Sequence, residues 1–532
     1  MLTSDEEDNV PLMQRAIEAR NSNCRVQDWV GFLVSIGLIL CGIACITVIS
    51  VYKEKVKDEY GVVLDAGSTH TNMFVYKWKV SDIIKGTALV KQIGNCTVTD
   101  DEGHVRGISS YQQNPEKAGK SLENCIKNTA KKLIPSYEHK TSPIYLGATA
   151  GMRLLNETDS SAANKIISSV RQTLGSSPFM FEDNYARIIS GEEEGISSWV
   201  TVNYLNDALV NSKETNQDES SRSMNRQTFG ALDMGGASTQ ITFVPTTTAP
   251  NSVKLTLYGK EYSVYTHSFL CYGLREAQRR FLAQLVKDAK YTAVVYNPCA
   301  PRGYLKIVNS KYLWGSPCVK GTEANDTLHN VTGTGNYSLC ATEVNKLFNF
   351  TSCAGNKYCS FDGVYLPPTD GDTFLAFSAY YAVVKDLNLT NNPSLDKLQA
   401  KTMNVCRMSW SEIKEIPSPS LDILSFYCFD AQYILTILSS GYHLNNTKAN
   451  LTFVGSIKKL SVGWALGFMI NATNLLPLLP PTSVSISRIQ SSVYLAVVIV
   501  GALLISAGLL ICITSAGRVH KRRQLQVGGL VL

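Results

Sequence analysis

The sequence of 532 residues is poor in charge and has no concentrated basic region in its middle. Charged residues make up 18% of the chain, below the quarter that is usual for globular proteins, and the formal net charge is +6. The dense basic cluster lies close to the C-terminus, at Arg518, His520, Lys521, Arg522 and Arg523. A nucleic-acid-binding domain carries a basic face, so this composition argues against nucleic acid as a partner.

Two common ligand motifs are also missing. No Cys-x-x-Cys pair occurs, which argues against a zinc site. The nearest approach to a Walker A phosphate loop is Gly119-Lys120-Ser121, but Asn114 stands where the first glycine is required and no strand precedes it. Any phosphate site in this chain must therefore be built in another way.

Long apolar runs, in contrast, are present at both ends. Segments 29–52 and 493–516 contain no charged residue, and each is long enough to cross a hydrocarbon core of about 30 Å. The alternatives are a cleaved signal peptide for the first and a buried core helix for the second. The first run is too long and too far from the N-terminus for a signal peptide, and the second is apolar up to a basic stop. We therefore expect two transmembrane helices in a lipid bilayer, which leave room for a homo-oligomer formed through them.

The orientation of these helices follows from the basic cluster and the glycosylation sequons. The cluster after the second helix predicts a cytoplasmic C-terminus (517–532), and two helices then predict a cytoplasmic N-terminus (1–28). All Asn-x-Ser/Thr sequons lie between the helices, at Asn95, Asn156, Asn325, Asn330, Asn336, Asn349, Asn388, Asn445, Asn450 and Asn471. The sequence thus predicts a multi-pass membrane protein with an extracytoplasmic, glycosylated ectodomain.

The cysteines agree with this compartment. Ten of the fourteen lie between the membrane segments, an even number that predicts five disulfides in an oxidising environment. Their spacing alone does not choose among the many pairings.

An internal repeat is the most informative feature of the ectodomain. The segment Val63–Thr69 (VLDAGST) is followed by Phe74, and the segment Leu232–Thr239 (LDMGGAST) is followed by Phe243. Both contain an apolar strand, an Asp, a turn of small residues with Ser and Thr, and a second strand. Two copies predict two homologous lobes that face each other across a cleft.

The repeat suits phosphate and metal chemistry. Tight turns of Gly, Ser and Thr let the backbone approach a phosphate closely and present many hydrogen-bond donors to it. Asp65 and Asp233 end the two strands just before these turns. Carboxylates and water suit Mg²⁺ or Ca²⁺, so we expect the two Asp residues to hold a hydrated divalent cation between the lobes.

A run of three carboxylates completes the candidate chemistry. Ser190-Gly191-Glu192-Glu193-Glu194-Gly195 follows the strand-like ARII. Such acidic runs usually form a solvated face. This one is bracketed by glycines and followed by apolar residues, which favours a helix N-terminus at the site, where one Glu acts as a general base on water.

The motifs DAGSTHT, GATAGMRLL, SGEEEG, LDMGGASTQ and SVGWALGFMINATN occur in this order. From Tyr60 to Pro477 the chain therefore resembles the ecto-nucleoside triphosphate diphosphohydrolases, or apyrases, of the membrane-bound cell-surface type. The resemblance implies an α/β fold with two lobes like those of actin, hexokinase and Hsp70 (duplicated RNase H-like lobes). It would place lobe I at 60–189, completed by 455–477, lobe II at 190–454 and a linker at 478–492. The implied activity is removal of terminal phosphates from extracellular nucleoside tri- and diphosphates such as ATP and ADP, with Ca²⁺ or Mg²⁺.

The resemblance also implies roles for individual residues. Glu193 would be the general base, with Ser238 and Gln240 orienting the attacking water. Asp65 and Asp233 would anchor the metal through its waters, with Thr149 and Trp464 in the same shell. Arg153 is either structural or adjacent to the phosphates. The remaining phosphate and nucleotide contacts implied are Gly67, Ser68, Thr69, His70, Thr149, Ala150, Gly235, Gly236, Ala237 and Tyr427. Tyr427 would face Tyr380 or Tyr381 across the purine or pyrimidine ring of the nucleotide.

The chain also departs from its relatives at two positions. Glu192 stands where Gln usually precedes the catalytic Glu, and Ile423 replaces an Arg found near the last cysteine pair in some of them. These departures leave the metal and base preferences open. The implied disulfides are Cys96–Cys125, Cys271–Cys318, Cys299–Cys340, Cys353–Cys359 and Cys406–Cys428.

Two other functions fit parts of this pattern. A sugar kinase of the same fold would need cytoplasmic ATP, which ten sequons outside the cell argue against. A nucleotide-binding or adhesion ectodomain without activity would tolerate loss of Glu193, Ser238 and Gln240, and all three are present.

Overall fold

The computed structural model describes thirteen stretches of the chain. They are residues 26, 29–47, 58–79, 89–209, 228–258, 260–321, 326–353, 355, 358–389, 392–417, 420–444, 450–475 and 488–528. These residues fall into two units, one spanning Asp58–Pro477 and the other containing the terminal helices. The sequons Asn325 and Asn445, most of the N-terminal tail and most of the linker at 478–492 lie outside the described residues.

Lobe I is built on a five-stranded sheet with the order β3-β2-β1-β4-β5. Its central strand is buried on both faces. Val62 and Leu64 pack under the helices α3 and α6, whereas Val63 packs against Trp199 and Trp464 on the opposite face. The strands are β1 (Asp58–Ala66), β2 (Thr71–Lys79), β3 (Lys91–Thr97), β4 (Ile144–Ala148) and β5 (Ala186–Ile188), and the helices are α3 (Glu116–Cys125), α4 (Lys131–Leu133), α5 (Ala150–Thr158) and α6 (Ser160–Gly175).

Lobe II repeats this topology. Its six-stranded sheet has the order β14-β13-β6-β7-β9-β8, in which β9, β7, β6, β13 and β14 occupy the places of β3, β2, β1, β4 and β5. In lobe I, β1 pairs antiparallel with β2 and parallel with β4, and in lobe II, β6 pairs antiparallel with β7 and parallel with β13. The duplication expected from the repeated Asp motif is therefore present in the sheets. The strands are β6 (Gly230–Met234), β7 (Ser238–Phe243), β8 (Val253–Leu257), β9 (Lys260–Leu270), β13 (Thr373–Ser378) and β14 (Asn450–Phe453).

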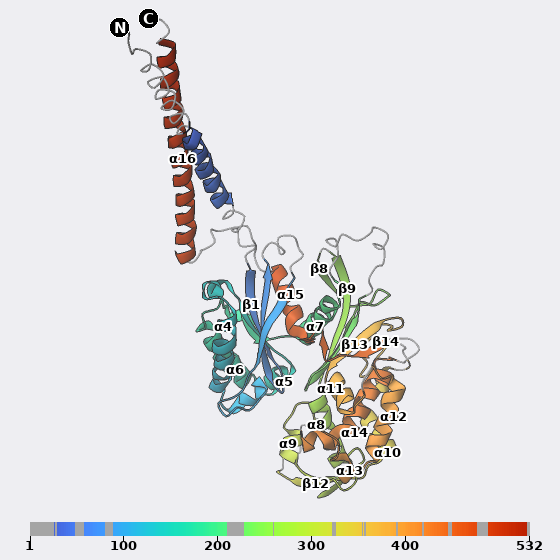
Figure 1. Cartoon of the computed structure of the whole chain (residues 1–532). Helices are drawn as coiled ribbons and strands as arrows, with labels where there is room; N and C mark the ends of the chain where they lie inside the picture. Colours follow the sequence, from blue (N-terminus) through green and yellow to red (C-terminus); the bar gives the residue numbers. More distant parts are fainter. Residues whose placement is uncertain are drawn as a thin grey trace, which may run out of the picture. The chain divides into compact units, whose positions relative to one another are not determined.

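Two helices lie between the sheets and connect the lobes. In Figure 1, α7 (Gly191–Leu205) and α15 (Trp464–Leu475) occupy the space between β1 on one side and β9 on the other. The two helices cross so closely at Gly467 that a Cβ on this residue would lie 1.9 Å from the carbonyl oxygen of Ser197. The first turn of α7 carries the three glutamates, so this crossing helps to fix the acidic run relative to both lobes.

The rest of lobe II is helical and held by disulfides. A small sheet with the order β10-β12-β11 lies at its edge. The elements are α8 (Leu274–Asp288), β10 (Val294–Asn297), β11 (Leu305–Asn309), α9 (Ser310–Trp314), β12 (Leu328–Gly333), α10 (Tyr337–Asn345), α11 (Ala379–Asp386), α12 (Leu395–Arg407), α13 (Trp410–Ile413) and α14 (Leu421–Thr436). After lobe II, β15 (Ser456–Ile457) and β16 (Leu460–Ser461) form a separate two-stranded sheet.

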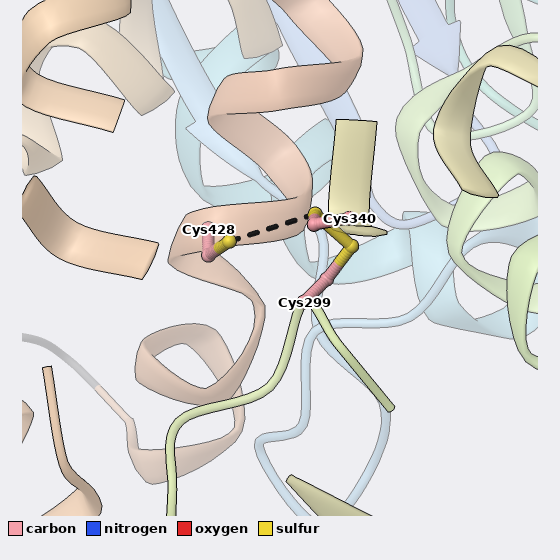
Figure 2. A group of neighbouring side chains, drawn as sticks. All are labelled: Cys299, Cys340 and Cys428. Atoms are coloured by element: carbon pink, nitrogen blue, oxygen red, sulfur yellow. Dashed lines mark hydrogen bonds between the residues drawn. A yellow bond between two sulfur atoms is a disulfide. The ribbon is translucent and has the colours of Figure 1, made fainter. Parts of the chain in front are cut away.

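The described residues contain five disulfides, and their pairs are those implied by the resemblance. They join Cys96–Cys125, Cys271–Cys318, Cys299–Cys340, Cys353–Cys359 and Cys406–Cys428. Figure 2 shows Cys299, Cys340 and Cys428 gathered at one point, with the Sγ atoms of Cys340 and Cys428 3.6 Å apart. Since both belong to disulfides, this cluster is the meeting of two crosslinks and supplies no thiolate to a metal.

Three described helices are long and apolar enough to cross a membrane. They are Trp29–Thr47, the α14 segment Leu421–Gly441 and the part Leu495–Lys521 of α16 (Arg488–Gly528). The α14 segment is mostly buried inside lobe II, so it is a core helix. The other two pack on each other, since a Cβ on Gly42 would lie 2.7 Å from the carbonyl oxygen of Gly501. Glycines at a crossing point allow such close approach of membrane helices.

Candidate active site

The two repeated turns have the same backbone geometry. In lobe I the Gly67 N–H donates to the His70 carbonyl at 2.9 Å, and in lobe II the Gly235 N–H donates to the Ser238 carbonyl at 2.9 Å. The strands on either side are in equivalent register, so that Asp65 pairs with Asn72 and Asp233 pairs with Gln240. The fold thus presents two equivalent tight turns, each with an Asp just before it.

The two turns approach each other across the cleft, and the backbone around them is crowded. A Cβ on Gly236 would lie 2.5 Å from the Ser68 Oγ of the opposite lobe. A Cβ on Gly107 would lie 2.1 Å from the Ser68 carbonyl oxygen, and one on Gly151 would lie 2.8 Å from the Ser68 Cα. Glycine at these positions lets neighbouring backbone support the Ser68 turn, a role that sequence reasoning did not assign to Gly107.

A cavity of about 440 Å³ lies between the turns. Of the fifteen site residues expected from the sequence, the cavity is lined by Asp65, Gly67, Ser68, Thr69, His70, Thr149, Ala150, Asp233, Gly235, Gly236, Ala237 and Ser238. Trp464, expected in the metal's shell, lines it too. Glu193, Gln240 and Tyr427 do not. The lining also includes residues that sequence reasoning missed, among them Glu194, Arg275 and Ser378.

Glu194 is the carboxylate of the acidic run that faces this cavity. Its Oε2 accepts hydrogen bonds from Arg153 Nη2 at 2.9 Å and from Gln240 Nε2 at 3.1 Å. Within the described part of the chain its Oε1 has no hydrogen bond. Burial raises the pKa of Glu194 to about 7, with Arg153 opposing the rise and the Asp233 carboxylate adding to it. A carboxylate with one free oxygen and a pKa near neutrality is suited to accept a proton from water.

The expectation that Glu193 faces the site is wrong. Glu193 is paired with Arg187 of β5, whose Nη1 donates to Glu193 Oε2 at 2.7 Å and whose Nη2 donates to Oε1. Glu193 does not line the cavity, and its side chain is 30% exposed, against 10% for Glu194. Successive helical side chains point about 100° apart, so only one of two neighbouring glutamates can point inward.

Ser238 and Gln240, which the resemblance places beside Glu193, lie beside Glu194 instead. Gln240 Nε2 is 2.8 Å from Ser238 Oγ and 2.9 Å from Ser268 Oγ, and Arg153 Nη2 donates to Ser238 Oγ at 3.1 Å. Gln240 is buried behind the wall of the cavity, and its Oε1 has no partner in the described structure. Arg153 therefore joins the acidic helix to the lobe II turn, which removes the ambiguity about its place.

Three carboxylates share this cavity, and of these Asp65 and Asp233 have no ion pair within the described residues. Burial raises the pKa of Asp65 to about 7, and the carboxylates of Glu194 and Asp233 add to the rise. Burial also raises the pKa of Asp233, although hydroxyls of Ser378 and Ser198 oppose it. Oxygen ligands and uncompensated negative charge are what a hydrated Mg²⁺ or Ca²⁺ needs, so the donor set fits the expected cation.

The aromatic pair expected to stack on both sides of the nucleotide's ring does not line the cavity. Tyr427 is 3% exposed on α14 and belongs to the apolar core of lobe II. Tyr380 is fully buried with its hydroxyl 3.0 Å from Thr239 Oγ1, and Tyr381 packs on Gly455. The expectation for Tyr427 is therefore wrong, because the apolar face of α14 turns it into the core. The aromatic side chains that line the cavity are Phe74, Tyr76 and Trp464.

Ser378 lines the cavity, but no signal in the sequence indicated that it would. It is the last residue of β13 and the N-cap of α11, with a φ of +55° that is unusual for a residue other than Gly, Asn or Asp. Strained backbone of this kind is concentrated at functional sites. No periodicity in the sequence signals it, since the strain arises from the sharp strand-to-helix turn.

Comparison with known proteins gives consistent similarities. Residues 51–491 match the GDA1/CD39 (nucleoside phosphatase) family. The chain is 42% identical over 425 residues to ectonucleoside triphosphate diphosphohydrolase 8 of Gallus gallus, covering 79% of this chain and 84% of that protein. It is 40% identical over 471 residues to ectonucleoside triphosphate diphosphohydrolase 1 of Mus musculus, covering 85% and 88%. A crystal structure of nucleoside triphosphate hydrolases from Neospora caninum aligns with a TM-score of 0.58 at 15% identity, covering 82% and 96%, which shows a shared fold.

Proposed function

The chain belongs to the GDA1/CD39 (nucleoside phosphatase) family, and on that premise we propose that it removes the terminal phosphate from nucleoside tri- and diphosphates. Relatives about 40% identical over most of their length are named ectonucleoside triphosphate diphosphohydrolases. The observation that carries the proposal is the position of Glu194, a buried carboxylate in a cavity whose other walls are the two repeated phosphate-type turns.

The turns supply the binding part of the reaction. Backbone N–H groups of Ser68 and Thr69 in lobe I and of Gly236 and Ala237 in lobe II would hold the phosphate oxygens, together with the Ser and Thr hydroxyls. Because the turns belong to different lobes, a polyphosphate held by both is fixed in direction along the cleft. Fixing the terminal phosphorus in line with an attacking water is most of what phosphoryl transfer requires of a protein.

Glu194 would act on the attacking water. The water oxygen bonds to the terminal phosphorus, the bond from phosphorus to the bridging oxygen breaks, and a water proton passes to the free Oε1 of Glu194. Ser238 Oγ would hold the same water, and Gln240 fixes both Ser238 and Glu194 through its side-chain nitrogen. Arg153 keeps the carboxylate in place through Oε2, and it leaves Oε1 to the water.

The family consists of nucleotide hydrolases that generally depend on divalent cations. Here Asp65 and Asp233 would hold Ca²⁺ or Mg²⁺ through water, with Thr149 and Trp464 nearby. When bound, such a cation neutralises phosphate charge and strengthens binding.

The terminal helices support a membrane location. We propose two passes in the plasma membrane, cytosolic termini and an extracellular ectodomain, with any homo-oligomer formed through the helices. Epitope tags at both ends should survive protease applied to intact cells, whereas the ectodomain should be cut. Cleavage of an N-terminal tag would contradict the two-pass arrangement.

Phosphate release by intact cells that express the chain tests the activity. ATP and ADP are supplied outside the cells, with and without a chelator, and vector-only cells are the control. We expect phosphate release from both nucleotides that stops with the chelator. If the protein is on the cell surface but releases no phosphate from either nucleotide, the hydrolase proposal is wrong. The alternative of a nucleotide-binding or adhesion ectodomain without activity would then stand.

A further inference from the structure

The small sheet of lobe II exposes an unusually apolar face. Its alternate residues Val295, Val308 and Val331 point into the core, with at most 4% exposed. The opposite face carries five large apolar side chains that are 46% to 67% exposed, namely Val294, Tyr296, Leu305, Ile307 and Leu328. We call these five residues the apolar face. Soluble ectodomains rarely leave so many large apolar side chains together in water without a covering group.

A glycosylation sequon stands at the centre of this face. Asn330 lies in the middle strand β12, paired with Val294 of β10 on one side and with Ile307 of β11 on the other. The sequon's Thr332 is on the same face, between Tyr296 and Leu305. Side chains directly opposite on neighbouring strands have Cβ atoms about 5 Å apart, so a sugar on Asn330 would start within reach of the apolar side chains.

We propose that an N-linked glycan on Asn330 covers the apolar face as a structural part of the ectodomain. The C–H faces of its first sugar rings would pack over Val294, Ile307 and Tyr296, and its hydroxyls would face water. A branched glycan in the middle of the sheet also prevents a flat protein surface from docking there. The position of the sequon therefore favours the glycan over a second copy of the chain or another protein.

The other described sequons lack this setting. Asn95 and Asn450 lie on the edge strands β3 and β14, Asn336 is the N-cap of α10, and Asn471 lies in α15. Asn156 projects from the end of α5, and Asn388 lies in a turn with a φ of +54°. Asn349 uses its side-chain oxygen to accept hydrogen bonds from Thr351 and Ser352. Of the described sequons, Asn330 is the one at the centre of an exposed apolar sheet face, so removal of its glycan should have an effect that removal of the Asn156 glycan does not.

The inference depends on the extracellular orientation proposed above, and one set of variants separates the two. Thr332→Ala removes the sequon but keeps Asn330, whereas Thr332→Ser keeps the sequon with a nearly matched change. Asn156→Gln is the control for loss of a glycan elsewhere. Peptide mapping after enzymatic deglycosylation in ¹⁸O water gives the occupancy of each sequon on the purified full-length chain.

Hydroxyl-radical footprinting then measures the cover directly. In Thr332→Ala we expect the oxidation rates of Tyr296, Leu305 and Ile307 to rise at least about twofold over wild type. Thr332→Ser and Asn156→Gln should leave these rates unchanged, and Tyr137 of lobe I should be oxidised equally in all samples. Adding Ile307→Thr to Thr332→Ala should reverse any self-association seen on gel filtration.

Each remaining outcome decides against one proposal. Occupied sequons elsewhere with an empty Asn330 would overturn the cover, as would oxidation rates that are equally high in Thr332→Ala and wild type. Protection that persists in Thr332→Ala would mean that a protein surface covers the face. If no sequon carries a glycan, the extracellular orientation itself is wrong.

Discussion

Arg187 and Glu193 form a bidentate ion pair that closes the junction between β5 and α7. It holds the first turn of α7 against the edge strand of lobe I and turns the middle glutamate away from the cavity. Glu194, one residue later, then points inward to Arg153 and Gln240. Glu193 thus has a positioning role, and Glu194 is available for chemistry.

Glu194→Gln should lower turnover about 10²- to 10⁴-fold, because the amide keeps the shape but cannot accept the water's proton. Nucleotide affinity should change far less, since the two phosphate turns are untouched. The measurement is kcat and KM for ATP hydrolysis at equal surface expression. Glu193→Gln is the matched control and should lose much less activity. Near-normal turnover in Glu194→Gln would remove it as the base.

Arg153→Met should impair both stability and turnover. Arg153 is the cation that contacts the buried Glu194 carboxylate, and it also holds Ser238 and the Ile189 carbonyl. Its loss should raise the pKa of Glu194 further and lower the ionised fraction at neutral pH. We expect a loss of about 10²-fold in kcat, the size reported for single electrostatic groups in active sites. Arg153→Lys keeps the charge and should recover part of the activity. Equal kcat in wild type and Arg153→Met would contradict this role.

Gly107→Ala should damage the lobe I turn without touching ligand directly. The added Cβ would meet the Ser68 carbonyl oxygen at 2.1 Å, so the backbone of one of the two must move. We expect KM to rise and turnover to fall, because the Ser68 turn holds phosphate. Gly175→Ala is the control, since its Cβ would make only ordinary contacts of 3.6 Å and more with Phe181. The measurements are kcat and KM for ATP hydrolysis and the thermal unfolding midpoint, for both variants and wild type.

Asp430 should make stability depend on pH. Burial raises its pKa to about 7, opposed by the hydrogen bond from Gln278 Nε2 at 2.7 Å and by Arg275. The folded state therefore holds this proton between about pH 4 and 7, whereas the unfolded chain, with a usual Asp pKa near 4, releases it. Stability from this group is complete below about pH 4 and is lost as pH rises through 7, by up to about 1.4 kcal/mol per pH unit.

Asp430→Asn isolates this contribution, because the amide cannot ionise and its oxygen can keep the Gln278 contact. The thermal midpoint of wild type minus that of Asp430→Asn should decrease from pH 5 to pH 8. A difference that is constant over this range would show that Asp430 does not change its ionisation on folding.

Asp233→Asn should separate the metal site from general stability. In chelator the variant should be more stable than wild type, because one of three crowded carboxylates is neutralised. With Ca²⁺ or Mg²⁺ the wild type should gain stability by binding, and the variant should gain much less. Thermal shift assays with and without cation measure both effects. An equal cation-induced shift in the two proteins would exclude Asp233 from the site.

Much of the site could be read from the sequence because its parts are local. The Asp65 and Asp233 motifs each specify a strand, a tight turn and a second strand within a few residues, and the fold reproduces both in equivalent register. The terminal apolar helices were predicted for the same reason, since length and composition alone make them compatible with a bilayer.

Which side chains face the cavity was decided by tertiary structure. Glu193 and Glu194 are neighbours of identical type, and only the partners Arg187 and Arg153, from β5 and α5, select which one points inward. Tyr427 matched an expected base contact, yet packing of α14 inside lobe II buries it. The sequence by itself determined the repeated turns and the chemistry they offer, because these depend on residues adjacent in the chain. Side-chain direction depends on contacts between residues far apart, so only the packed lobes fixed it.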